Sequence, residues 1–92
     1  MNNYNVIWTN KYKKAYKLCK KRGYNMKLLD NIVYQLANGI PLELKYNDHK
    51  LHGKYNDFRE CHIEPDWILI YKIEDDKLIL TLTNTGSHSD LF

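Results

Sequence analysis

Residues 59–71 read Arg-Glu-Cys-His-Ile-Glu-Pro-Asp-Trp-Ile-Leu-Ile-Tyr and predict the centre of a β-sheet. The first part belongs to an alternating segment, 57–63, that places Phe58, Glu60 and His62 on one strand face and Arg59, Cys61 and Ile63 on the other. Glu64-Pro65-Asp66 predicts a turn, because proline suits that position. The run 67–73 is nearly all apolar, which is typical of a central strand with both faces partly covered.

The segments around this hairpin are less regular. After a turn at 74–77, residues 78–83 predict the last long strand, and 84–92 form a short tail carrying Gly86, His88 and Phe92. Residues 42–54 have no clear period, so we expect a loop that runs into a short strand near His52 to Tyr55.

The N-terminal part predicts a strand followed by two helices. Residues 4–8 are rich in aromatic and β-branched side chains, as strands are. Thr9 and Asn10 are good N-cap residues for a helix that ends at Gly23, with an apolar face of Tyr12, Ala15, Tyr16 and Cys19. Asn25 can cap a second helix that ends at Gly39 before Pro41, with a stripe of Met26, Leu29, Val33 and Leu36 widened by Leu28 and Ile32.

Strand, helix, helix and then three or four antiparallel strands make an α+β domain with a helical pair packed on one sheet. The length of 92 residues fits a single domain over 1–92 with one core. No segment resembles a signal peptide or reaches the roughly 20 apolar residues of a membrane span, so we expect a cytoplasmic protein with no membrane contact. Cys19 and Cys61 are then expected to be reduced packing residues.

Charge is divided unevenly along the chain. Residues 1–29 contain eight Lys or Arg and no acid, whereas 30–92 contain six Lys or Arg against eleven Asp or Glu, a balance of −5. This asymmetry indicates either a polyanionic partner for the first helix, usually nucleic acid, or a solvated lysine-rich face.

The four histidines, His49, His52, His62 and His88, all lie in the C-terminal half and suggest proton transfer or metal binding. His49 and His52 could bind zinc from a helix, but their segment does not read as one and has no nearby cysteine. We therefore expect proton transfer with no metal and no cofactor. The turn predicts that His62 lies close to Asp66. For any single histidine, a surface or packing role is the more common one.

Cleavage of RNA needs side chains that donate and accept protons, as histidine does near neutral pH. The 2′-hydroxyl must lose a proton to attack the phosphate, the 5′-oxygen must gain one to leave, and a cation must neutralise the phosphate. Aromatic rings such as Trp67 and Phe92 can stack on an unpaired base.

Four segments carry a resemblance to a known family: 48–51 (Asp-His-Lys-Leu), 53–55 (Gly-Lys-Tyr), 59–71 as quoted, and 85–92 (Thr-Gly-Ser-His-Ser-Asp-Leu-Phe). Together they resemble the YafQ-type toxins of the RelE/ParE toxin superfamily. The resemblance covers the C-terminal half without a gap, and the N-terminal half agrees in layout only.

The resemblance implies the toxin of a type II toxin–antitoxin system, with a RelE-like fold of a twisted antiparallel sheet, two helices on one face and an RNA cleft on the other. It implies a ribosome-dependent mRNA endoribonuclease that cuts mRNA in the A site and is blocked by a cognate antitoxin, often a DNA-binding dimer. The family's functional histidines correspond to His49, His62 and His88, its acid to Asp66, and its aromatics to Trp67 and Phe92. His52 lies outside the shared pattern.

Within that family pattern, we expect His88 to be the general acid and Asp66 the general base, directly or through His62, although the exchanged assignment fits the sequence equally. His49 and His62 are expected to neutralise or position the phosphate. Arg59 could hold the phosphate too, but its strand parity, opposite to His62, favours a structural role. Further RNA contacts are expected from Lys54 and from the first helix, which would bind ribosomal RNA or acidic antitoxin side chains through Lys13, Lys17, Lys20 and Lys21.

Three other functions are compatible with the sequence. RelE-like folds also serve toxins that poison DNA gyrase, and degenerate members could act only as antitoxin-binding modules. A nuclease acting on free RNA is a third possibility, but the sparse set of histidines favours a substrate that the ribosome orients.

Overall fold

A computed structural model describes residues 3–92, so Met1 and Asn2 of the expected domain lie outside the described part. The elements follow in the order β1 (Asn5–Trp8), α1 (Asn10–Lys21), α2 (Met26–Ala37), a 3-10 turn η1 (Leu44–Tyr46), β2 (His49–Lys50), a second 3-10 turn η2 (Gly53–Tyr55), β3 (Arg59–Glu64), β4 (Trp67–Glu74), β5 (Ile79–Gly86) and α3 (His88–Leu91). No helix within these residues is long and apolar enough to cross a membrane.

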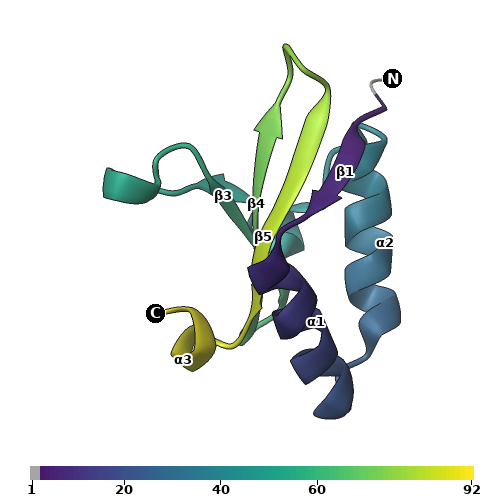
Figure 1. Ribbon diagram of the computed structural model, residues 1–92, viewed down its shortest axis with the longest axis vertical. Coiled ribbons are helices and arrows are strands. Elements are labelled where there is room, and N and C mark those ends of the chain that lie inside the picture. Colours follow the sequence, from purple (N-terminus) through teal and green to yellow (C-terminus); the bar gives the residue numbers. More distant parts are fainter. Residues whose placement is uncertain (1–2) are drawn as a thin grey trace.

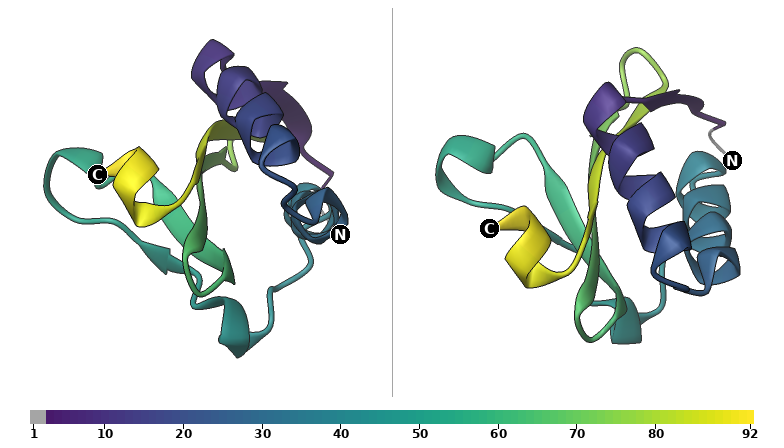
Figure 2. Two further views of the ribbon diagram at one scale, coloured as in Figure 1. Left: turned by 90° about the horizontal axis from the view of Figure 1, so that it is seen from below. Right: turned by 60° about the horizontal axis from the view of Figure 1, so that its bottom comes forward.

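The strands form one five-stranded sheet in the order β1-β5-β4-β3-β2 (Figure 1). The apolar strand β4 is central, as predicted, and β2 through β5 pair antiparallel. Strand β1 joins the sheet parallel to β5. The helices α1 and α2 cover one side of this sheet, whereas α3 and η2 lie on the other (Figure 2). The predicted α+β class, with a helical pair packed on a mainly antiparallel sheet, is confirmed.

Local signals set the helix ends. The Thr9 hydroxyl accepts a hydrogen bond from the Tyr12 N–H at 3.0 Å and donates to the carbonyl of Thr83 at 3.0 Å, so the start of α1 is fastened to β5. Gly23 has φ +83°, the left-handed conformation predicted for the residue after α1. Asn25 occupies the N-cap position of α2, but its side chain makes no capping hydrogen bond.

The hydrophobic core lies between the helices and the sheet. The inward faces of β3, β4 and β5 meet α1 and α2 there, and the buried members are Tyr12, Leu29, Ile32, Leu36, Cys61, Ile63, Trp67, Leu69, Tyr71, Leu80 and Leu82. In β3 the predicted alternation is confirmed for Cys61 and Ile63, which are buried in this core. Both cysteines are unpaired and buried, in agreement with packing roles.

Three boundaries differ from the prediction. The short strand is His49–Lys50, and residues 53–55 form the turn η2 instead. Leu78 has φ +53° and belongs to the turn before β5, and β5 continues to Gly86 because residues as far as Gly86 pair with β4. The expected tail therefore contains the end of a strand and the single-turn helix α3.

Candidate active site

The sheet face opposite the helices carries two rows of residues that cross the strands. Directly paired residues of antiparallel strands share a face. The first row contains His49 of β2, Glu60 of β3, Ile70 of β4 and Asn84 of β5, and the second contains His62, Ile68 and Gly86. The register thus brings His49 and His62 to neighbouring positions on one face, although 12 residues of chain, including η2, separate them.

Helix α3 adds the third predicted histidine. The imidazole Nδ1 of His88 lies 2.9 Å from Oδ1 of Asp66, and the His88 backbone N–H donates to the same oxygen at 3.1 Å. The ring centroids of His62 and His88 are 5.9 Å apart, and those of His49 and His62 are 6.4 Å apart. The structure therefore brings His49, His62, His88 and Asp66 together, whereas His52 is exposed at the start of η2.

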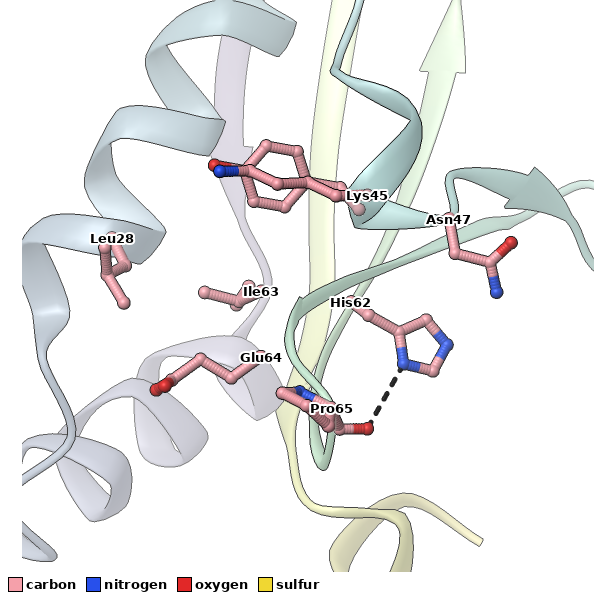
Figure 3. Close-up of a pocket in the computed structure, with 8 residues that line it drawn as sticks. Leu28, Lys45, Asn47, His62, Ile63, Glu64 and Pro65 are labelled. Atoms are coloured by element: carbon pink, nitrogen blue, oxygen red, sulfur yellow. Dashed lines mark hydrogen bonds between the residues drawn. The ribbon is translucent and has the colours of Figure 1, made fainter.

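His62 and Asp66 belong to the same cluster, in which the side chain of Asp66 pairs with His88. Within residues 3–92, the side-chain contact of Asp66 is with His88, and His62 Nδ1 instead lies 3.4 Å from the carbonyl oxygen of Pro65. The Asp66 carboxylate thus reaches α3. The carbonyl of Pro65 faces the His62 imidazole (Figure 3).

A hydrogen-bonded cap holds α3 against the rest of the domain. The Asp90 carboxylate accepts from the Ser87 backbone N–H at 3.0 Å and forms an ion pair with Arg22 at 2.8 Å. The Ser87 hydroxyl in turn accepts from the Asp90 N–H, which completes a capping box. A Cβ atom at Gly86 would lie 2.9 Å from Asp90 Cβ, so this close approach requires glycine.

These contacts change the acidity of two carboxyls. The hydrogen bonds that Asp66 receives from His88 lower its pKa below the ordinary value, since they stabilise the charged form. The Ser87 backbone N–H, followed by the Arg22 guanidinium, lowers the pKa of Asp90. Both groups are therefore carboxylates well below neutral pH.

Glu60 is a site residue that the sequence analysis did not single out. Its side chain is only 10% exposed, with Oε2 lying 3.1 Å from His49 Nε2 and Oε1 lying 3.7 Å from His62 Nε2. The alternating strand pattern of residues 57–63 could have identified it, because this pattern places Glu60 on the same strand face as His62.

Trp67 is buried in the core, so in this structure its ring is not accessible for the expected stacking on a base. It is 2% exposed, its Nε1–H donates to the Thr85 hydroxyl at 3.0 Å, and its ring makes an edge contact with Tyr24. Because β4 is apolar on both faces, composition could not tell which face Trp67 occupies. Phe92, by contrast, is 65% exposed, and its ring centroid lies 6.3 Å from that of His88.

Arg59 lies in β3 with its side chain on the opposite sheet face from His62. Its Nε donates to Asp48 Oδ1 at 3.3 Å, and the Tyr71 hydroxyl donates to the same carboxylate oxygen. This geometry supports the structural role that strand parity indicated. Lys54 lies in η2, with its ammonium 5.2 Å from the Tyr55 ring centroid.

The four predicted lysines of α1, Lys13, Lys17, Lys20 and Lys21, are all exposed. Three of them, Lys13, Lys17 and Lys20, line a shallow cavity of about 430 Å³ with the rings of Trp8 and Tyr16. The expected basic face of α1 is therefore accessible to a partner.

A larger cavity, of about 510 Å³, lies between α2, η1 and the β3–β4 turn. Figure 3 shows that Ile63 and Glu64 point into it from one side of the chain, whereas His62 and Asn47 point away from α2. His62 thus forms the border between this cavity and the histidine-bearing face. Across residues 3–92, no group of three or more His, Cys, Asp or Glu side chains has a geometry suited to a metal ion.

Comparisons with known proteins agree on one family. Residues 4–92 match the model of the family described as bacterial toxin of type II toxin–antitoxin system, YafQ. The chain is 40% identical over 88 residues to the mRNA interferase toxin YafQ of Escherichia coli K12, covering 95% of this chain and 94% of that protein.

Two solved structures are also similar over nearly their whole length. One is the E. coli DinJ–YafQ toxin–antitoxin complex, with a TM-score of 0.90, 38% identity and coverage of 98% of both chains. The other is a metal-bound toxin from Helicobacter pylori, with a TM-score of 0.90, 43% identity and coverage of 97% of this chain and 99% of that chain.

The two lowered pKa values lead to a prediction for acid solution. A carboxyl whose pKa is lower in the folded protein contributes stability that is present above its unfolded-state pKa and is lost as pH falls through the folded value. The backbone N–H of His88 donates to Asp66, and that of Ser87 donates to Asp90. Because each amide senses the charge of its carboxylate, we expect both amide signals to titrate in NMR spectra with midpoints below the ordinary carboxyl value of 3.8.

An Asp66→Asn variant is the control for this titration. It should abolish the acid transition of the His88 amide and leave that of Ser87, because Ser87 reports on Asp90. Midpoints at or above 3.8 for both amides in the unmodified protein would contradict the described docking of α3.

Proposed function

The chain belongs to the YafQ family of bacterial toxins of type II toxin–antitoxin systems, and from this premise we propose that it is an mRNA interferase. In this proposal it cuts mRNA on the ribosome by acid–base chemistry and needs no metal ion. The observation that carries the proposal is the gathering of His49, His62, His88 and Asp66 on the open face of the sheet.

His88 is proposed as the general acid that protonates the leaving 5′-oxygen. Because Asp66 Oδ1 lies 2.9 Å from Nδ1, the carboxylate holds a hydrogen on that nitrogen and leaves Nε2 free to exchange a proton with RNA. Asp66 thus orients the acid.

His62 is proposed as the general base that accepts the proton of the 2′-hydroxyl. The sequence alone favours Asp66 as the base, directly or through His62. The hydrogen bonds from His88 lower the pKa of Asp66, however, and a more acidic carboxyl is a weaker proton acceptor. His62 lies beside His88 with a ring that is partly accessible, which supports it as the base.

His49 is proposed to neutralise the charge that builds up on the phosphate. Two contacts position its ring for this role, Nδ1 lying 2.7 Å from the Asn47 carbonyl oxygen and Nε2 lying 3.1 Å from Glu60 Oε2. The exposed ring of Phe92, beside His88, is suited to stacking on a base of the mRNA.

The proposed partners are the ribosome with its mRNA and a cognate antitoxin. The exposed lysines of α1 suit ribosomal RNA, whose phosphate backbone attracts lysine without regard to sequence. The antitoxin, by analogy with DinJ in the E. coli complex, would block the toxin by binding it. A protein that acts on translating ribosomes works in the cytoplasm, where we place it.

The proposal predicts that mRNA on ribosomes is cut and that His88→Ala reduces the single-turnover cleavage rate about 10²- to 10⁴-fold, the usual contribution of a general acid. The measurement is mapping of new 5′ ends on one mRNA, free and ribosome-bound. His52→Ala is the matched control and should cut normally, because His52 lies outside the cluster.

Two results would contradict this proposal. No cuts on ribosome-bound mRNA, from a protein that still arrests growth, would favour a binding toxin that acts on a target such as gyrase. A rate that collapses when a transition-metal chelator sparing Mg²⁺ is added would contradict the metal-independent mechanism.

The basic face of α1 yields a separate prediction. Lys17→Glu with Lys20→Glu should weaken ribosome association about tenfold and flatten its salt dependence, since phosphate contacts release counterions. The control, Lys45→Glu with Lys77→Glu, changes the net charge equally but lies in η1 and in the β4–β5 turn. Equal weakening by both pairs in ribosome co-sedimentation would mean that α1 is not the ribosome-binding surface.

A further inference from the structure

A small cavity of about 80 Å³ lies on the open side of the sheet, between η2, β5 and α3. Both η2 and α3 lie on this side, away from the helical pair (Figure 2). Three aromatic rings line the cavity, those of Tyr55, Phe58 and Phe92. Two polar side chains of β5, Thr83 and Asn84, line it as well. The cavity thus combines aromatic walls with groups that can form hydrogen bonds.

This cavity adjoins the proposed acid. Phe92 lines it, and the ring centroid of Phe92 lies 6.3 Å from that of His88. Asn84 belongs to the same row of the sheet as His49. An RNA whose scissile phosphate lies at the histidines therefore has a neighbouring base within reach of the cavity.

A β-bulge brings two consecutive side chains of β5 to the cavity. Ile70 of β4 pairs with Asn84 of β5. The next residue of β4, Tyr71, pairs with Leu82, so Thr83 is an extra residue in β5. Neighbours in a regular strand point to opposite faces, whereas Thr83 and Asn84 both line the cavity. Bulges often redirect side chains in this way beside active sites.

The side chain of Asn84 is a nearly buried amide with one half unused. The residue is only 8% exposed, and its Oδ1 accepts the backbone N–H of Thr85 at 3.0 Å, which fixes the orientation of the amide. Within residues 3–92, its Nδ2 has no hydrogen-bond partner. The Thr83 hydroxyl oxygen is likewise buried without a partner in the part of the chain that is described. Buried polar groups are nearly always hydrogen-bonded, so an unpartnered amide at a cavity indicates a ligand.

We propose that this base cavity binds one base of the mRNA next to the scissile phosphate and that Asn84 selects this base, an inference that rests on the proposed function. Aromatic side chains stack on unpaired bases, and the rings of Tyr55 and Phe92 are both accessible. Because Oδ1 is already occupied, Asn84 offers the N–H groups of Nδ2 and selects a base edge that presents a hydrogen-bond acceptor. The small volume suits one edge of a base.

Two other roles for Asn84 predict different behaviour. A purely structural Asn84 stabilises the bulge through Thr85 and affects only the stability of the protein. An amide that binds a phosphate oxygen, together with Lys11 beside the same cavity, affects all mRNA sequences alike, because phosphates carry no sequence information. Only a residue that contacts a base changes the relative rates at which different sequences are cut.

The test measures single-turnover cleavage of ribosome-bound mRNAs in which each position of the A-site codon carries each of the four bases in turn. Asn84→Asp keeps the shape and the accepting oxygen and replaces the donor by an acceptor. Asn56→Asp is the matched control, because it makes the same chemical change at an exposed residue that follows η2 and does not line the base cavity. Tyr55→Ala removes a half-exposed wall of the cavity. Thermal unfolding accompanies each variant.

We expect the unmodified protein to prefer certain bases at one codon position by about 3- to 10-fold, the contribution of one hydrogen bond. Asn84→Asp should change the preferred base at that position and leave the other positions as they are, and Asn56→Asp should match the unmodified protein. Tyr55→Ala should weaken the preference at the same position, because the base is held less firmly. If Asn84→Asp does not fold, Tyr55→Ala decides by that position.

Three results would overturn the proposal. One is an Asn84→Asp protein whose base preferences equal those of the unmodified protein, and another is equal slowing for all four bases at every position. The third is an unmodified protein that cuts without preference at all three codon positions. Failure of the unmodified protein to cut any ribosome-bound mRNA would instead contradict the proposed function, so the two failures are distinguishable.

Discussion

The register of the β3–β4 pair is the constraint on which the rest of the structure depends. It sends Cys61 and Ile63 into the core and leaves Glu60 and His62 on the open face. A slip of one residue would exchange these faces, burying a carboxylate and a histidine against α2 and exposing the core side chains. The free energy of burying the apolar face therefore also fixes where the proposed chemistry occurs.

Onto this frame the fold adds two carboxylate–histidine pairs, one on each side of His62. Glu60 and His49 approach from β3 and β2, and Asp66 and His88 approach from the turn and α3. In the first pair the carboxylate is largely buried and the imidazole is 42% exposed, whereas both members of the second pair are exposed. An acid and a base that act in sequence need different environments, and this arrangement supplies two around one central imidazole.

The sequence predicted the elements whose signals are local. The alternation in β3, the apolar run of β4 and the Thr9 cap of α1 each appear where expected, because each depends on neighbours within a few residues. The two-residue strand β2 was placed too late in the chain, because only its pairing with β3 defines it. The capping box of Ser87 and Asp90 was readable in the sequence, yet residues 84–92 were expected to be a tail.

The site was predicted as a set of residues more accurately than as a set of contacts. Family resemblance identified His49, His62, Asp66 and His88, and the structure gathers them. The sequence did not indicate that Asp66 contacts His88, because the direction of a turn side chain depends on tertiary contacts. It also did not indicate that Trp67 is buried. Glu60 was overlooked because a single acid on a strand usually faces solvent.

The most direct test of the acid–base mechanism replaces the leaving oxygen. In an mRNA whose cleavage site carries a 5′-bridging sulfur, the leaving group is a thiolate, which needs no general acid because a thiol has a pKa of only about 8.5. If His88 protonates the leaving group, the His88→Ala variant should cut this substrate on the ribosome at nearly the rate of the unmodified protein. A variant equally slow on the sulfur and oxygen substrates would contradict that role.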